Sequence, residues 1–124
     1  MGVDHMRFAG STRPGRGVLK ASAESYLKRV SRELGGKSPN IICPDADVDA
    51  AMQSAFWGIF GNKGEICSAG SRLLLHADIH DKFLDGMVSR AKRMRVGDPL
   101  DKGTAMGSQI SQIQMDRILG YIKS

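Results

Sequence analysis

Apolar side chains recur at steps of three and four residues in several stretches of this chain, and each such stretch predicts a helix. The clearest covers residues 48–60, where Asp47 or Asp49 can cap the first turn. Further helices are expected over residues 14–25, from residue 78 or 80 to about residue 91, and from a cap at Ser111 onward.

Short apolar runs between these helices predict strands. The runs cover residues 6–9, 26–34, 39–43 and 72–76. Glycine and proline clusters separate the strands from the helices, as Gly35 and Gly36 do after the second run. Strands that alternate with helices are typical of α/β architecture, which is the fold class that we expect.

The composition is that of an ordinary globular protein. The chain has 124 residues, which is a single-domain length, and 41% of them are hydrophobic and 25% charged. The net charge is +5, because 18 Lys and Arg residues outnumber 13 Asp and Glu residues. The basic residues are scattered and few aromatic residues lie among them, so we expect no nucleic-acid binding.

The sequence also indicates in which cellular compartment the protein works. It has no apolar run near the length of a membrane span, and its N-terminus lacks the layout of a signal peptide. The two cysteines, Cys43 and Cys67, lie in unrelated contexts, which suits a reducing cytoplasm. The three histidines show no metal-ligand spacing with cysteines or carboxylates, so we expect no metal site.

Two side chains are candidates for covalent chemistry. Cys67 lies among small residues, where a thiol stays accessible, and Glu33 precedes two glycines that let the backbone come close to a ligand. A thiol nucleophile and a carboxylate base are sufficient for thioester chemistry. On spacing alone, a buried inert cysteine and a solvated surface glutamate remain the alternatives. Cys43 ends an apolar strand, and we interpret it as structural.

A third candidate is the turn from Gly10 to Gly15, which joins a strand to a helix. Backbone N–H groups at the start of a helix favour phosphate. The turn is not a P-loop, because no Lys-Ser or Lys-Thr pair follows Gly15. An ordinary connection between strand and helix is the alternative.

Several segments together resemble the aldehyde dehydrogenase superfamily. The most specific is FGNKGEICSAGSR at residues 60–72, followed by RELGGKSP at residues 32–39. Weaker matches are FAGST at residues 8–12, where the family usually has FTGST, DADVD at 45–49 and RVGDPLD at 95–101. The resemblance implies a slice from the middle of a longer enzyme. Residues 1–35 would be the C-terminal part of a Rossmann-like coenzyme-binding domain, and residues 36–124 the N-terminal part of the α/β catalytic domain.

The resemblance also implies roles for the candidates. Cys67 would attack an aldehyde to form a thiohemiacetal, with its own backbone N–H as an oxyanion donor, and Glu33 would activate the water that hydrolyses the thioester. NAD or NADP would be bound by Gly10, Ser11 and Gly15, with the backbone at Leu34 near the nicotinamide.

One position departs from the family pattern. Arg32 stands where the family has an apolar residue, and it could pair with Glu33 and weaken the base. Strand geometry favours the opposite, because adjacent side chains of a strand face opposite sides.

Three functions are therefore open. The first is NAD(P)-dependent oxidation of an aldehyde, with little or no turnover by this chain alone because much of the family's coenzyme site lies outside it. The second is a coenzyme-independent esterase that uses Cys67 and Glu33. The third is a non-catalytic module that self-associates or forms a homo-oligomer through exposed apolar surface. The identity of the aldehyde and the choice of NAD over NADP stay open.

Overall fold

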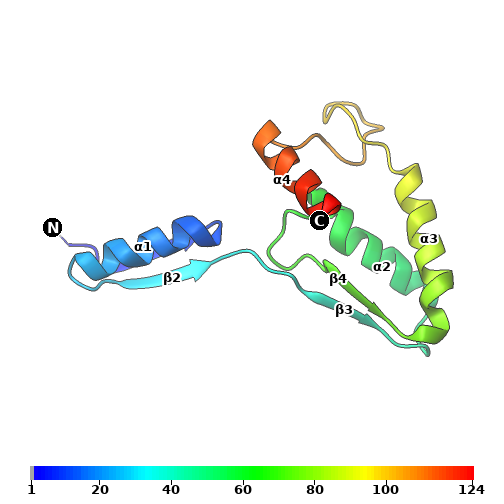
Figure 1. Cartoon of the computed structure of the whole chain (residues 1–124), viewed down its shortest axis with the longest axis horizontal. Coiled ribbons are helices and arrows are strands. Elements are labelled where there is room, and N and C mark those ends of the chain that lie inside the picture. Colours follow the sequence, from blue (N-terminus) through cyan, green and yellow to red (C-terminus); the bar gives the residue numbers. More distant parts are fainter. Residues whose placement is uncertain (1) are drawn as a thin grey trace.

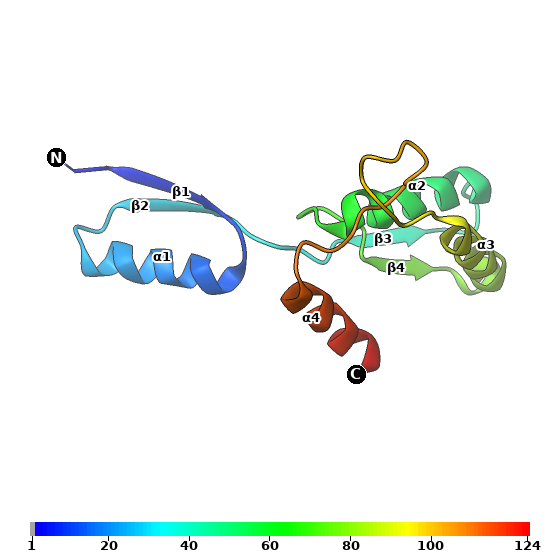
Figure 2. The same ribbon diagram turned by 90° about the horizontal axis from the view of Figure 1, so that it is seen from above.

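The computed structural model describes residues 2–124, so Met1, the first residue of the predicted segment 1–35, lies outside the described residues. Figures 1 and 2 show two separate α/β units joined by the extended segment that follows β2. Each unit has a two-stranded sheet and at least one helix, and they are called the first and second layer below. The chain is a mixture of helices and parallel strands connected by helices, which confirms the predicted α/β fold class.

The first layer is one strand–helix–strand unit. It consists of β1 (His5–Ala9), α1 (Thr12–Glu24) and β2 (Arg29–Glu33). β1 and β2 are parallel, with His5 opposite Arg29 and Ala9 opposite Glu33. β2 begins at Arg29 rather than at the predicted residue 26, because Leu27 adopts φ 59° in the turn after α1. A left-handed residue of this kind breaks the extended path of a strand.

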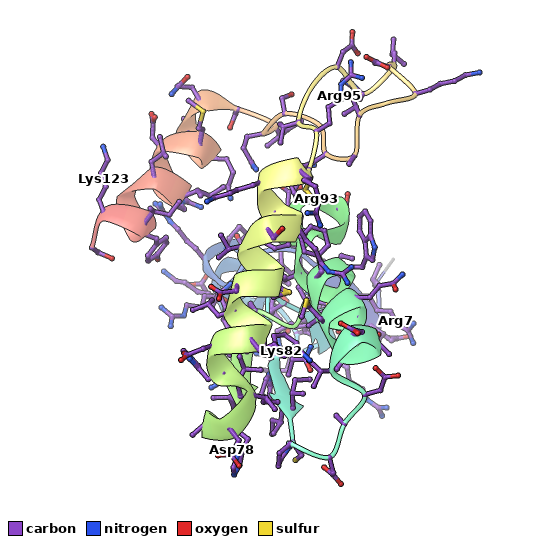
Figure 3. The ribbon with its side chains drawn as sticks, turned by 90° about the vertical axis from the view of Figure 1, so that its right-hand side faces the viewer. Arg7, Asp78, Lys82, Arg93, Arg95 and Lys123 are labelled. Atoms are coloured by element: carbon purple, nitrogen blue, oxygen red, sulfur yellow. The ribbon has the colours of Figure 1, made fainter. Side chains whose placement is uncertain are left out.

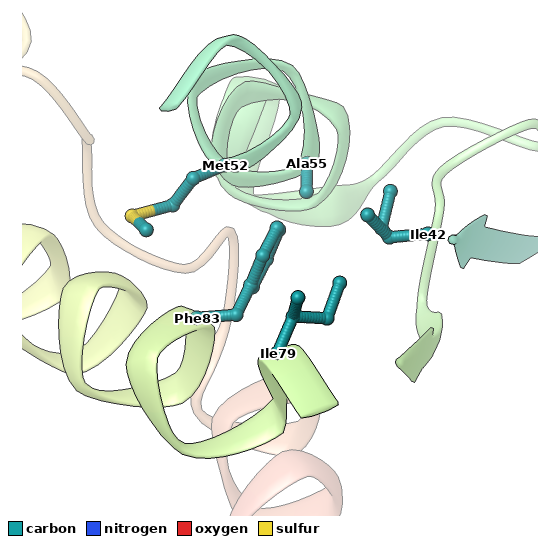
Figure 4. Packing of buried hydrophobic residues seen from close by; sticks show 5 residues of the cluster. All are labelled: Ile42, Met52, Ala55, Ile79 and Phe83. Atoms are coloured by element: carbon teal, nitrogen blue, oxygen red, sulfur yellow. The ribbon is translucent and has the colours of Figure 1, made fainter. Parts of the chain in front are cut away.

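The second layer holds the core. It consists of β3 (Pro39–Ile42), α2 (Val48–Phe60), the short helix η1 (Gly61–Gly64), β4 (Arg72–Leu75), η2 (Ala77–Ile79) and α3 (His80–Arg93). β3 and β4 are parallel, and α2 and α3 pack together beside them. Phe83 of α3 is fully buried and points toward α2, next to Met52, Ala55 and Ile79 (Figure 4).

Two predicted helix caps are confirmed. The Asp47 carboxylate accepts hydrogen bonds from the N–H groups of Asp49 and Ala50, both at 3.1 Å. The Ser111 hydroxyl accepts from the N–H of Gln114 at 3.3 Å and begins α4 (Gln112–Lys123). These caps satisfy N–H groups that have no partner inside the helix.

Much apolar surface is uncovered. The chain exposes 9575 Å², whereas a compact protein of this size exposes roughly 6,500 Å². Parallel sheets are usually covered on both faces, yet Ile41 and Leu74, which lie opposite each other on β3 and β4, are 66% and 51% exposed. Ile113 and Ile122 of α4 are 75% and 74% exposed, so these two apolar side chains have little cover from residues 2–124.

Candidate functional site

A cleft of about 480 Å³ lies where the end of the first layer meets the loop that follows α2. Three segments line it, at residues 9–11, 33–37 and 64–67. The first two begin at the carboxyl ends of the parallel strands β1 and β2, which meet at one edge of their sheet. The cleft therefore brings together Cys67, Glu33, Gly10, Ser11 and Leu34, which were all predicted site residues.

A tight turn presents Cys67. Cys67 and Ser68 form its middle, and the Ala69 N–H donates to the Ile66 carbonyl at 3.0 Å to close it. The buried Ala69 and a hydrogen bond from the Gly70 N–H to the Gly58 carbonyl, 3.1 Å long, tie the turn to α2. Within residues 2–124 the N–H of Cys67 donates no backbone hydrogen bond, and the cysteine itself is exposed.

Glu33 ends β2 with its backbone fixed and its side chain exposed. Its carbonyl accepts from the Gly10 N–H at 3.0 Å, which joins the two strand ends. Arg32 lies opposite Phe8, on the face that α1 covers, so Glu33 lies on the open face. Among residues 2–124, Glu33 forms no ion pair with Arg32 or with any other cation. The carboxylate is thus free to face a ligand.

Ser11 and Gly15 have different surroundings. Ser11 is the N-cap of α1, but its side chain makes no capping hydrogen bond, so its hydroxyl is available where it lines the cleft. Gly15 is buried one turn further along, and a Cβ added there would be 3.0 Å from Cδ2 of Leu34. The structure therefore does not bring Gly15 into the lining of the cleft.

Several lining residues had no predicted site role, and Lys37 and Gly36 are two of them. Lys37 adds a cation, and Gly36 lies so close to the cysteine turn that an added Cβ would be 2.3 Å from the Cys67 carbonyl oxygen. Both follow Glu33 in the same segment. In the sequence alone, the glycine pair indicates only a flexible stretch of backbone, and nothing gives Lys37 a role. Glu65 also lines the cleft and is paired with Lys63 at 3.3 Å.

Cys43 is not part of the cleft. It follows the end of β3, and it is exposed rather than packed as a structural cysteine would be. Both cysteines are free thiols within the described chain. Residues 2–124 contain no group of three or more His, Cys, Asp or Glu side chains that could hold a metal ion. No helix in the described part of the chain combines the length and the apolar character that a membrane crossing requires.

The basic side chains come from separate elements. In Figure 3 the labelled cations lie on β1 (Arg7), on α3 (Lys82 and Arg93), on the loop that follows it (Arg95) and on α4 (Lys123).

Comparison with known proteins identifies the family. A family model described as "Aldehyde dehydrogenase family" matches residues 1–124. The chain belongs to the aldehyde dehydrogenase family. An aldehyde dehydrogenase from Aspergillus niger is 51% identical to it over 123 residues, which are 99% of this chain and 25% of that relative.

Solved aldehyde dehydrogenases have the same local fold. A putative aldehyde dehydrogenase from Burkholderia cenocepacia matches with a TM-score of 0.93 and 48% identity, over 98% of this chain and 24% of the other. An aldehyde dehydrogenase from Bacillus cereus, solved in complex with NAD+, matches with a TM-score of 0.93 and 43% identity, again over 98% and 24%. The chain thus spans about a quarter of the length of the relatives it matches.

Proposed function

We propose that this chain supplies the nucleophile and the base for the NAD(P)-dependent oxidation of an aldehyde to a carboxylic acid. Family membership supports the reaction class. The single observation that carries the assignment of residues is that Cys67 and Glu33, from two different layers of the fold, line one cleft.

Cys67 acts first. Its sulfur bonds to the carbonyl carbon of the aldehyde, the thiol proton passes to Glu33, and the carbonyl oxygen takes up the negative charge of the thiohemiacetal. The Cys67 N–H, which donates no backbone hydrogen bond within residues 2–124, stabilises this oxyanion. The small residues of the turn leave the sulfur accessible to the substrate.

Glu33 acts again in hydrolysis. After the oxidation the acyl group remains on the sulfur as a thioester. Glu33 first releases the thiol proton to solvent and then takes a proton from a water molecule, whose oxygen bonds to the acyl carbon. The carbon–sulfur bond breaks to release the acid, and the proton held by Glu33 passes to the sulfur to restore the thiol. A carboxylate without an ion pair among residues 2–124 suits this role, because no cation within ion-pair distance holds it.

The residues around Ser11 fit a nicotinamide dinucleotide. The free Ser11 hydroxyl and the N–H groups in the first turn of α1 are donors suited to a phosphate. Gly10 and the backbone at Leu34 complete this side of the cleft. When bound, the coenzyme supplies the acceptor for the hydride that leaves the substrate. A relative solved with NAD+ supports this choice of coenzyme class, while NAD and NADP stay open.

The two layers correspond to the two proposed parts of a larger enzyme. Residues 1–35 belong to the coenzyme-binding part and residues 36–124 to the catalytic part, with their boundary inside the segment between β2 and β3. We infer little or no aldehyde turnover by this chain alone, because the cleft is open and the coenzyme has few contacts here. Robust NADH formation from the chain with a series of aldehydes would overturn that inference.

The roles of Cys67 and Glu33 can be tested without turnover. A chromogenic ester should acylate Cys67, which intact-protein and peptide mass spectrometry detect as an added acyl group. Glu33→Gln should slow the loss of this group at least several-fold, whereas Cys43→Ala should change nothing. Equal acylation of both cysteines, or equal deacylation in Glu33→Gln and the unaltered protein, would refute the assignment.

A coenzyme-independent esterase is the second candidate, and the open cleft favours it because the nucleophile and base are exposed without the rest of the enzyme. Multiple turnovers with the ester that are abolished by Cys67→Ala and unaffected by NAD support this function. If Cys67 is acylated but the acyl group is not released, the result supports the assignment of Cys67 as nucleophile and not the esterase function.

A further inference from the structure

The backbone of Gly36 is pressed against the backbone of the cysteine turn. A Cβ at this position would be 2.3 Å from the carbonyl oxygen of Cys67 and 3.5 Å from its carbonyl carbon. The obstacle is main chain, so no side-chain rotation relieves it. Glycine is therefore the only residue that fits here without a shift of the turn.

Neither side of this contact can move easily. The cysteine turn is tied to α2 through the Gly70 N–H and the Gly58 carbonyl. On the other side, Nε of Arg72 donates to the Lys37 carbonyl at 2.8 Å, and the Arg72 N–H donates to the Ser38 carbonyl at 3.2 Å. Gly36 therefore lies between Glu33, which ends the first layer, and residues that are fixed to the second.

The neighbouring glycine has different surroundings. A Cβ on Gly35 would meet nothing within 4 Å. The two adjacent glycines are therefore not equivalent, although the sequence alone suggests a flexible pair. Only Gly36 carries a steric requirement that involves Cys67.

We propose that Gly36 is a positioning residue that holds the Cys67 turn at the distance from Glu33 at which the carboxylate can take up the thiol proton. This inference rests on the proposed function, because it presumes that Glu33 is the base. An added methyl group at position 36 displaces the Cys67 carbonyl, and the sulfur moves with its backbone. A misplacement of about 1 Å in a reacting group can cost on the order of 100-fold in rate.

The test is the rate at which iodoacetamide alkylates each cysteine at neutral pH, measured by peptide mass spectrometry. Cys43 is exposed and lies outside the cleft, so it is an internal control in every sample. Four proteins form a double-mutant cycle: the unaltered chain, Glu33→Gln, Gly36→Ala and the combination of both. Gly35→Ala, alone and combined with Glu33→Gln, is the matched comparison.

We expect Glu33→Gln to slow the alkylation of Cys67 at least several-fold in the unaltered chain and in Gly35→Ala. In Gly36→Ala, alkylation should already be slow, and Glu33→Gln should slow it no further, because the two groups no longer meet. A purely structural role for Gly36 would not remove the dependence on Glu33. The Cys43 rate should stay constant throughout.

Each other result is decisive. Independent effects of Glu33→Gln and Gly36→Ala on the rate of Cys67 alkylation overturn the positioning role. The same holds if Gly35→Ala also removes the dependence of this rate on Glu33. The role is also overturned if Gly36→Ala lacks the far-ultraviolet circular dichroism signal that the unaltered chain shows, or if it changes the alkylation rate of Cys43. Either result would mean that the contact is a requirement for folding. If Gly36→Ala alters Cys67 specifically but Glu33→Gln has no effect in any background, the base assignment fails while Gly36 still positions the turn.

Discussion

The Cα atom of Gly15 in α1 faces the side chain of Leu34 so closely that an added Cβ would be 3.0 Å from Cδ2 of Leu34. Gly15 is buried, and Leu34 lines the cleft directly after Glu33. The position of α1 on its sheet thus depends on packing against a residue of the candidate site. A change in this helix can reach the site through packing alone.

Substitutions at two glycines of α1 should separate helix propensity from this packing. Gly17→Ala should stabilise the chain by up to about 1 kcal/mol, because alanine favours helix and the new methyl group meets nothing within 4 Å. Gly15→Ala gains the same propensity but must displace Leu34, so its stabilisation should be smaller or negative. Urea unfolding followed by circular dichroism measures both. Equal gains at the two positions would contradict the close packing against Leu34.

The core of the second layer should depend on Phe83. Its side chain is fully buried between α2 and α3, so Phe83→Ala should destabilise the chain by about 3 kcal/mol or more. Leu84, the next residue along α3, is 45% exposed, and Leu84→Ala is the matched control with an expected cost below about 1 kcal/mol. Chemical unfolding compares the two, and similar losses would argue against the core assigned here.

The start of α2 should depend on one carboxylate. Asp47→Ala removes the acceptor of two backbone N–H groups and should cost about 1 kcal/mol. Asp45 lies two residues earlier in the turn before the helix, and Asp45→Ala should change stability by less than about 0.5 kcal/mol. Thermal unfolding of the two variants tests this, and a larger loss for Asp45→Ala would contradict the capping role.

The exposed apolar side chains of α4 should drive self-association. Sedimentation velocity over a range of concentrations should show reversible association, and the double variant Ile113→Ser, Ile122→Ser should weaken it, because both side chains are about three-quarters exposed. Lys123→Ser changes a polar exposed residue of the same helix and should leave association unchanged. A monomer at every concentration would count against the interaction-module hypothesis.

The sequence predicted the elements well because the strongest patterns coincide with the packed structure. The three- and four-residue spacing from Val48 to Phe60 became α2, and its cap is Asp47 as expected. The ends of the elements were less accurate. α1 begins at Thr12 rather than residue 14, since Ser11 can act as an N-cap through its backbone conformation without a side-chain bond.

The sequence names chemical groups that line the cleft, and their roles in the reaction stay predictions. Cys67 and Glu33 stand out as residue types in suitable surroundings. The requirement at Gly36 could not be predicted, because it depends on a carbonyl that lies 31 positions away in sequence. For the same reason the packing of Gly15 against Leu34 could not be predicted, and the contact of Gly15 with a coenzyme stays a prediction.

The extended segment at residues 34–38 is the one covalent tie between the two layers among the described residues, and it also forms much of the cleft wall. The length of this segment therefore sets the separation between the site residues of the first layer and those of the second. One inserted residue would leave every helix, every strand and every reactive group unchanged, and would still pull the halves of the site out of alignment.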